Sequence, residues 1–145
     1  MFPKLPFNEQ LLIWSARKWV QSRGQGTGLH ETLRTAFQLA RAPEAHIALD
    51  AFLTILFATN MRAIEMYPPE AVTVTSDELR LSALVATLQV DEDEDRAFAL
   101  LSHWLPVAAQ RHGILHCNIL AQELLAAGHQ FSPHERVDEK PGRQE

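Results

Sequence analysis

Residues 43–60 read PEAHIALDAFLTILFATN, and their apolar side chains leave no face of a helix free for water. At 100° per residue, one apolar stripe consists of Ile47, Ala51, Ile55 and Ala58. A helix that is apolar all round belongs inside a protein or a membrane, and this apolar run is too short to span a bilayer. We therefore expect residues 43–60 to form the central helix of a soluble bundle.

The other strongly periodic segments also repeat their apolar residues every three to four positions, which is the helical period. They predict further helices over residues 8–22, 29–41, 76–90, 96–104 and 106–127. Only residues 71–75 alternate in the manner of a short extended segment. The predicted fold class is therefore all-α, with five or six helices packed in two layers around the central helices 43–60 and 76–90.

Several residues mark where these helices begin, bend or end. Asn8 is a favourable N-cap for the first helix, and Thr75 with Glu78 matches a capping box at the start of a later one. Gly128 follows the last helix as a C-terminal stop. Gly113 lies inside that helix and weakens it by roughly 1 kcal/mol relative to alanine, so we expect a kink or a division there.

Length and composition fit one domain. A chain of 145 residues with 46% hydrophobic and 21% charged residues is large enough to bury a core without disulfides. We assign residues 1–131 to a single helical domain and residues 132–145, SPHERVDEKPGRQE, to a disordered charged tail. The single cysteine, Cys117, and the lack of a signal-peptide pattern in the first residues predict a cytoplasmic location.

Charge is divided unequally along the chain. The net charge is −5, with +3 over residues 1–64 and −8 over residues 65–145. A charge of +3 is far below the dense basic patches of nucleic-acid binders, and the apolar runs are too short for a membrane span. The sequence therefore predicts neither nucleic acid nor a membrane as the partner, and the division suits docking between complementary protein faces.

Two histidine patterns are candidates for chemistry. His112, His116 and Glu123 project from one side of the predicted last helix, and two histidines one turn apart could ligate zinc. The HExxH pattern is absent, and a polar outer face is the simpler explanation. His46 and Asp50 also stand one turn apart, either as an oriented general base or as a local hydrogen bond without catalytic meaning. We expect no bound metal or other cofactor.

Two further motifs are incomplete. The acidic residues 91–95 begin like a calcium loop, but Arg96 replaces the required glycine and Ser102 replaces the bidentate glutamate. We expect these acids to stabilise the positive end of the next helix. The glycine-rich residues 23–28 lack the lysine and the spacing of phosphate-binding loops, so they predict a flexible linker between helices.

One stretch carries a resemblance. Residues 77–106 contain DELRLSALVATLQ and a second helix that ends in LLSHWLP. This stretch resembles small helical bacterial proteins that are usually catalogued as uncharacterised. The resemblance covers about a fifth of the chain and carries no functional motif, so it implies nothing about activity.

The pattern as a whole favours a non-enzymatic protein-interaction or regulatory module that binds a protein partner or associates with itself as a homodimer. Five apolar residues lie outside the inward-facing stripes of the predicted helices and are therefore candidates for a partner interface. They are Trp14 on the first helix and Met61, Met66, Tyr67 and Val72 in the connector. The N-terminal segment covers Trp14 or leaves it to a partner, and the connector is an apolar strap or a binding surface. The alternative is a small metal- or ligand-binding protein, or an enzyme, that uses the histidine patterns.

Truncation tests the predicted tail. The residues after Phe131 contain one aliphatic side chain, Val137, and cannot bury enough area to offset their ordering entropy. A chain that ends at Ser132 should therefore melt within a few degrees of the full-length protein in a thermal scan followed by circular dichroism. A large loss of melting temperature would show that the tail docks on the domain.

Overall fold

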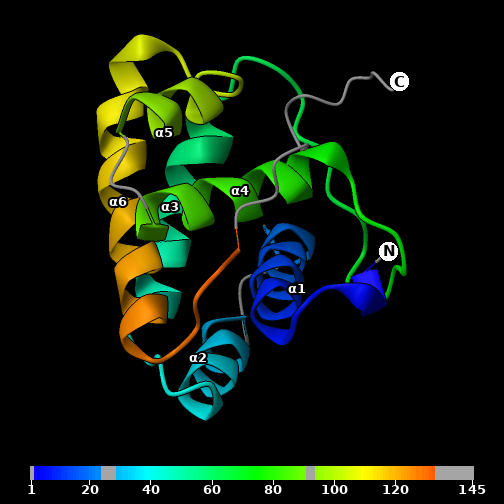
Figure 1. The fold of residues 1–145 in the computed structure, drawn as a ribbon. Helices are drawn as coiled ribbons and strands as arrows, with labels where there is room; N and C mark the ends of the chain where they lie inside the picture. Colours follow the sequence, from blue (N-terminus) through cyan, green and yellow to red (C-terminus); the bar gives the residue numbers. More distant parts are fainter. Residues whose placement is uncertain (1, 24–28, 91–93, 133–145) are drawn as a thin grey trace.

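The computed structural model describes residues 2–23, 29–90 and 94–132. Over these residues the protein has six α-helices, one 3-10 turn and no β-strand, which confirms the predicted all-α fold (Figure 1). In chain order the elements are η1 (Phe2–Lys4), α1 (Phe7–Gln21), α2 (Leu29–Leu39), α3 (Ala45–Thr59), α4 (Ser76–Val90), α5 (Glu94–Leu101) and α6 (Val107–Ala126). Residues 71–75, expected to be extended, form bends and irregular backbone.

Three sequence predictions fall on residues that are not described. The glycines of the expected linker lie at positions 24–28, most of the acidic run lies at 91–93, and the expected tail is described only at Ser132. α5 begins at Glu94, within the acidic run, so Glu94 and Asp95 lie in its first turn. These two carboxylates are at the helix end where negative charge is favourable.

α3 and α6 form an antiparallel pair. The end of α3 lies beside the start of α6, because the backbone N–H of Met61 donates to the carbonyl of Trp104 at 2.7 Å. α4 crosses the molecule from α1 to α6, and α5 packs on α4 and α6 (Figure 1). The two helices that the sequence predicts as central, 43–60 and 76–90, do not pack mainly on each other, because each packs most extensively against α6.

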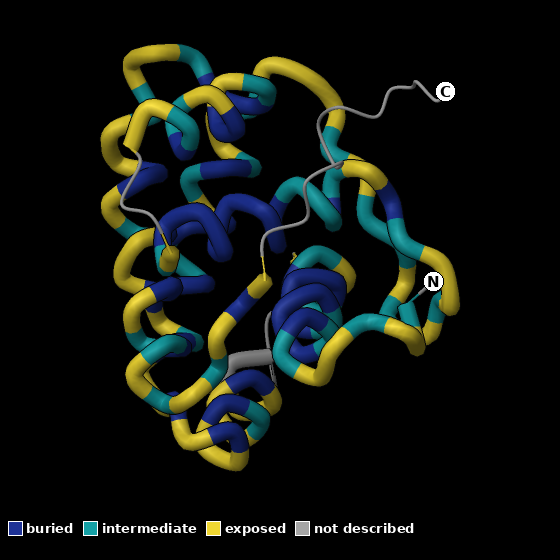
Figure 2. The backbone as a smooth tube through the Cα atoms, in the orientation of Figure 1, coloured by how far each residue is buried: buried dark blue, intermediate teal, exposed yellow. Residues whose placement is uncertain are grey.

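The helix that is buried all round is α4. All eight residues from 81 to 88 are buried, and this stretch forms the dark centre of Figure 2. α3 buries most of its circumference, but Ile47 is 57% exposed and Ala58 is also exposed. The expectation that no face of residues 43–60 meets water is therefore wrong for the stripe that contains these two residues.

One ion pair is fully buried where α1 packs against the start of α4. Arg17 Nε donates to Glu78 Oε2 at 2.8 Å, and Arg17 Nη2 donates to Glu78 Oε1 at 2.9 Å. Both side chains are 0% exposed. Arg17 Nη1 also donates to the carbonyl of Ala71 at 3.1 Å, and Nη2 to that of Thr73 at 2.7 Å. The pair thus joins α1, α4 and the connector between α3 and α4.

The first turn of α4 holds the connector from the other side. The predicted capping box is present: the Glu78 N–H donates to Thr75 Oγ1 at 2.9 Å, and the Thr75 N–H donates to Glu78 Oε1 at 3.0 Å. Glu78 Oε2 also accepts the N–H of Tyr67, and Asp77 accepts the N–H of Glu65. Polar contacts with backbone groups therefore order the connector, in addition to any apolar packing.

Two local expectations differ from the structure. Asn8 is not an N-cap, because α1 begins at Phe7 and the Asn8 side chain donates to the carbonyl of Gln130 at 2.9 Å. α6 runs without interruption through Gly113. A Cβ at that position would lie 2.9 Å from Leu101 Cδ2, so the glycine permits close packing of α6 against the end of α5.

The C-terminus of the described chain is part of the core. Gly128, with φ 92°, ends α6 as predicted, and the N–H of His129 donates back to the Leu124 carbonyl in a Schellman motif. His129 Nε2 lies 2.7 Å from the carbonyl oxygen of Ala40. Phe131 is buried, and its N–H donates to the side chain of Gln89 at 2.7 Å.

Neutralising one partner of the buried ion pair should destabilise the fold. Glu78→Gln keeps the shape of the side chain but leaves the guanidinium of Arg17 uncompensated in the core. We expect a loss of about 3–5 kcal/mol in the free energy of unfolding, measured by urea denaturation.

The exposed pair Arg34–Glu31 supplies the control, since its side chains are 50% and 73% exposed. Glu31→Gln makes the same chemical change in solvent and should alter stability by less than about 1 kcal/mol. Equal losses for the two variants would mean that the buried pair does not anchor the connector.

Candidate functional site

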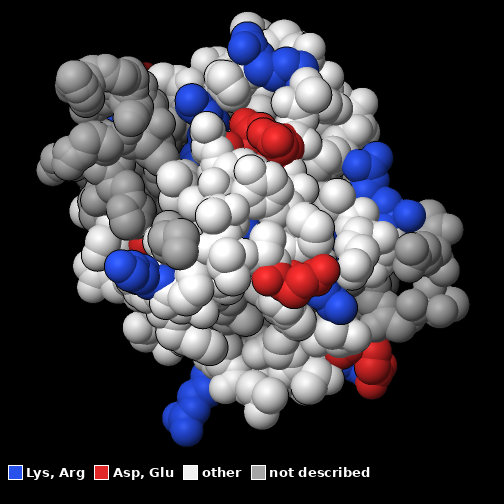
Figure 3. Space-filling model, turned by 90° about the vertical axis from the view of Figure 1, so that its right-hand side faces the viewer, with Lys and Arg blue, Asp and Glu red and all other residues white. Residues whose placement is uncertain are grey.

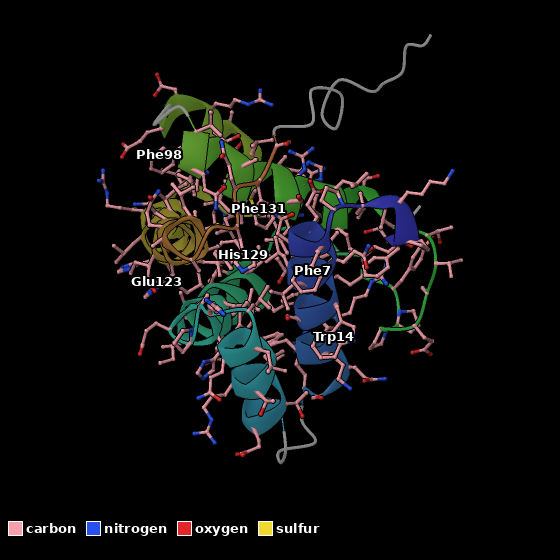
Figure 4. The ribbon with its side chains drawn as sticks, turned by 60° about the horizontal axis from the view of Figure 1, so that its bottom comes forward. Phe7, Trp14, Phe98, Glu123, His129 and Phe131 are labelled. Carbon is pink, nitrogen blue, oxygen red and sulfur yellow. The ribbon has the colours of Figure 1, made fainter. Side chains whose placement is uncertain are left out.

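The residues predicted to bind a partner lie in separate places. Trp14 is half-buried and shares a surface hollow of about 210 Å³ with Phe2 of the N-terminal segment and with Phe7, Gln10 and Leu11 of α1. Figure 4 shows Phe7 and Trp14 on the same side of α1. The ring of Trp14 also packs against the core. Phe2 thus brings the N-terminal segment next to this ring.

The connector residues have different neighbours. Met66 and Tyr67 are half-buried and line a second hollow, of about 250 Å³, beside Arg17 and α1. Val72 is exposed, and its carbonyl accepts the N–H of Phe2. Met61 is also exposed but lies at the end of α3, next to the turn that precedes α6. The five predicted residues do not form one surface.

The histidines of the last helix lie on the surface of α6. His112 is exposed, while His116 and Glu123 are half-buried. Among the described residues, no group of three or more His, Cys, Asp or Glu side chains could hold a metal ion. Cys117, the nearest thiol in the sequence, is fully buried, and burial raises its pKa far above the ordinary value.

His46 and Asp50 have separate partners. His46 Nδ1 lies 2.9 Å from the carbonyl of Pro43, whereas Asp50 accepts the indole N–H of Trp19 at 2.8 Å. The structure therefore orients Asp50 towards α1, away from a role as the partner of a histidine base. Trp19 in turn stacks on Phe57, with 5.6 Å between ring centroids, so this carboxylate helps to fix α1 against α3.

His103 lies near the start of α4, with Nε2 3.9 Å from Asp77 Oδ1. Its pKa is lowered, first by burial and then by the positive charges of Arg80 and Arg62, against a smaller opposing effect of Asp77. The same Asp77 oxygen accepts the indole N–H of Trp104 at 2.9 Å. These contacts place His103 in the network that holds the end of α5 to α4.

An exposed apolar surface lies on α3 and α6, and sequence reasoning did not identify it as a site. We call it the α3/α6 face, and it consists of Ile47, Ala51, Thr54 and Ala58 on α3 and Ala108, His112, Leu115 and Ile119 on α6. Leu115 is 53% exposed and Ile119 is 43% exposed. Both are large apolar side chains that the monomer leaves in water.

One end of the α3/α6 face is hollowed. A depression of about 420 Å³ is lined by both helices, through Thr54, Ile55, Ala58, Thr59, Pro106, Ala108, Ala109 and His112. The two threonine hydroxyls in it already donate to carbonyls of their own helix, Thr54 to Asp50 and Thr59 to Ile55. These two hydroxyls therefore need no hydrogen bond from a group that covers the depression.

Charge depletion is the sequence signal that could have revealed this face. α3 and α6 together comprise 35 residues, and their only charged side chains are Asp50, Arg111 and Glu123. The chain average of 21% would place about seven charged residues there. Asp50 accepts a hydrogen bond from the indole of Trp19, which directs its carboxylate towards α1. On the opposite side of the molecule, Figure 3 shows positive and negative side chains interspersed.

The protein was also compared with known proteins. Neither the family models, nor the curated proteins, nor the solved structures contain a match to this chain. None of the helices in the described part of the chain combines the length and the apolar character of a membrane span.

Trp14→Ala tests whether this ring belongs to the fold. Because the ring is half-buried against the core, its loss should lower the free energy of unfolding by about 1–3 kcal/mol, less than for a fully buried tryptophan. Urea denaturation measures this, and light scattering should show unchanged self-association. Leu39→Ala is the control, since Leu39 is 81% exposed and its truncation should change stability by about 0.5 kcal/mol or less. Unchanged stability with lost association would instead assign Trp14 to an interface.

Proposed function

We propose that this protein is a non-enzymatic protein-interaction module whose partner docks on the α3/α6 face. The proposal rests on one observation: large apolar side chains are exposed on two helices that carry few charged residues. Ile47, Leu115 and Ile119 are each about half exposed, yet the two helices that bear them hold three charged residues in 35. Depletion of charge around exposed aliphatic side chains is typical of the core of a protein–protein interface.

The shape of the face supports the same proposal. A depression of about 420 Å³ stands beside protruding apolar side chains. Interface hot spots are commonly side chains of one partner inserted into such depressions of the other. The hydroxyls of Thr54 and Thr59 donate to carbonyls within α3, so an apolar side chain can fill this part of the depression without leaving a threonine hydroxyl unpaired.

The other candidate surfaces support a partner less well. Trp14 is half-buried next to Phe2 of the N-terminal segment, and Met66 and Tyr67 are half-buried within the anchored connector. Met61 is the exception, because it is exposed and lies beside the hollowed end of the α3/α6 face. Met61 therefore remains a predicted partner-binding residue, at the rim of the docking surface. His112 would be covered by the same partner, which argues against a solvent-accessible metal or catalytic site there.

The proposal retains two predictions from the sequence. The partner is a protein, because positive charge is too sparse for nucleic-acid binding and the docking face is uncharged. A cytoplasmic location stays a prediction that rests on the single cysteine.

A charged substitution on the face tests the proposed function. In an extract of the cells that naturally produce the protein, the full chain should elute from gel filtration in a complex larger than its own 16.3 kDa. Ile119→Arg places a charge in the middle of the face and should shift the protein to the monomer position.

Leu39→Arg is the matched control, because it introduces the same charge at an exposed aliphatic residue of α2. It should leave the complex intact. Elution of the unmodified protein as a monomer, or equal behaviour of the two variants, would contradict the proposal. Circular dichroism of both purified variants verifies that each is folded.

A further inference from the structure

We infer that the partner on the α3/α6 face is a second copy of this chain, related by a two-fold axis that lies in the plane of the interface and perpendicular to the helices. The inference rests on the proposed function, and it specifies the partner of the same face. In this arrangement α3 packs antiparallel on α3 of the second copy, and α6 packs antiparallel on α6. A two-fold interface requires that the face be complementary to itself.

The face has this self-complementarity along its length. Its hollowed end lies at the second half of α3 and the first turns of α6. At its other end, which we call the protruding end, Ile47 on α3 is 57% exposed and Ile119 on α6 is 43% exposed. Ile47 stands seven residues before Thr54, and Ile119 seven residues after His112, so both lie about two helical turns beyond the hollow.

The two-fold operation brings opposite ends together. Because α3 and α6 are antiparallel to each other, their protruding side chains lie at the same end of the pair. Turning a second copy about an axis between the two ends places its Ile47 over the region of Ala58, and its Ile119 over the region of Ala108. Leu115 lies between the protruding and hollowed ends of α6, close to the axis, where it meets its own counterpart.

The available area is sufficient for a specific dimer. α6 has 20 residues, which corresponds to a length of about 30 Å. α3 has 15 residues, which corresponds to about 22 Å. Two helices of these lengths, each about 10 Å wide, present about 520 Å² per copy, or about 1,040 Å² for the pair of copies. This value is close to the roughly 1,000 Å² that a biological interface should bury.

The chain itself offers no segment that could cover the face in place of a second copy. The undescribed residues 133–145 contain one aliphatic side chain, Val137, and residues 24–28 and 91–93 contain none. None of these segments could fill a depression of about 420 Å³ and also cover three large aliphatic side chains. A face that is complementary to itself is therefore best satisfied by its own copy.

Sedimentation equilibrium of the purified full chain tests the inference. The expected mass is twice the 16.3 kDa of one chain. Ile119→Arg should raise the dissociation constant about 30-fold or more, as for the loss of an interface hot spot. Leu39→Arg should leave it unchanged. A monomeric mass at every concentration would overturn the inference.

A cross-link tests the arrangement without relying on a charged variant that could affect folding. Leu115→Cys places a thiol close to the two-fold axis, so oxidation in air should give a disulfide-linked dimer on a non-reducing gel. Leu39→Cys, at a position that is 81% exposed against 53% for Leu115 but lies off the face, should remain uncross-linked, and Cys117 is fully buried in the structure. A dimeric mass without cross-linking at position 115 would overturn the two-fold packing proposed above.

The two levels of the proposal can fail separately. If the purified chain is monomeric while Ile119→Arg still abolishes a larger complex in the cell extract, the α3/α6 face binds a different protein. In that case the second-copy inference is wrong and the proposed function stands. If neither the purified chain nor the extract shows a complex, both are wrong.

Discussion

The fold depends on the buried ion pair between Arg17 and Glu78. Two charges removed from water must find partners for every hydrogen-bonding group, since an unpaired one would cost several kcal/mol. The structure satisfies them with each other and with the backbone of the connector, through the carbonyls of Ala71 and Thr73 and the N–H groups of Tyr67 and Thr75. A segment without regular secondary structure is thereby held in one conformation. The phenyl ring of Phe2 completes the site, with the guanidinium carbon 4.7 Å from its centroid, so the N-terminal segment is fixed by the same arginine.

This arrangement divides the molecule into two sides with different chemistry. On one side, α1, the start of α4, the connector and the N-terminal segment are joined by charged and polar contacts, and both signs of charge appear on the surface (Figure 3). On the other side, α3 and α6 pack through apolar side chains and carry almost no charge. Because α4 reaches from one side to the other with eight consecutive buried residues, the two sides share a single core. The side chains of the α3/α6 face therefore lie on the outside of the molecule and are not part of this core.

Two local signals in the sequence predicted local structure correctly, whereas the expectations at Asn8, Gly113 and residues 71–75 were wrong. The capping box at Thr75 and Glu78 and the glycine stop at position 128 depend on residues a few positions apart, and both were correct. Contacts between distant residues could not be predicted in this way. Arg17 stands beside Lys18 on what the helical period marks as the outer side of α1, and its partner is 61 residues away. Likewise, the sequence of an apolar helix does not show whether each of its apolar stripes is covered by the core of the same chain or by a partner. For this reason α3 was expected to be buried on every side.

The position of the α3/α6 face has a consequence for how a partner would bind. Ile47, Leu115 and Ile119 lie on the water side of α3 and α6, while the inner sides of these helices hold the buried residues of the core. A partner that covers them need not open the ion pair, the connector or the C-terminal segment anchored by Phe131. Binding would therefore resemble the docking of preformed surfaces, in which the backbone moves little and little ordering entropy opposes association. A face of modest area can support specific association under that condition, because affinity depends on preorganisation and hot-spot packing more than on area.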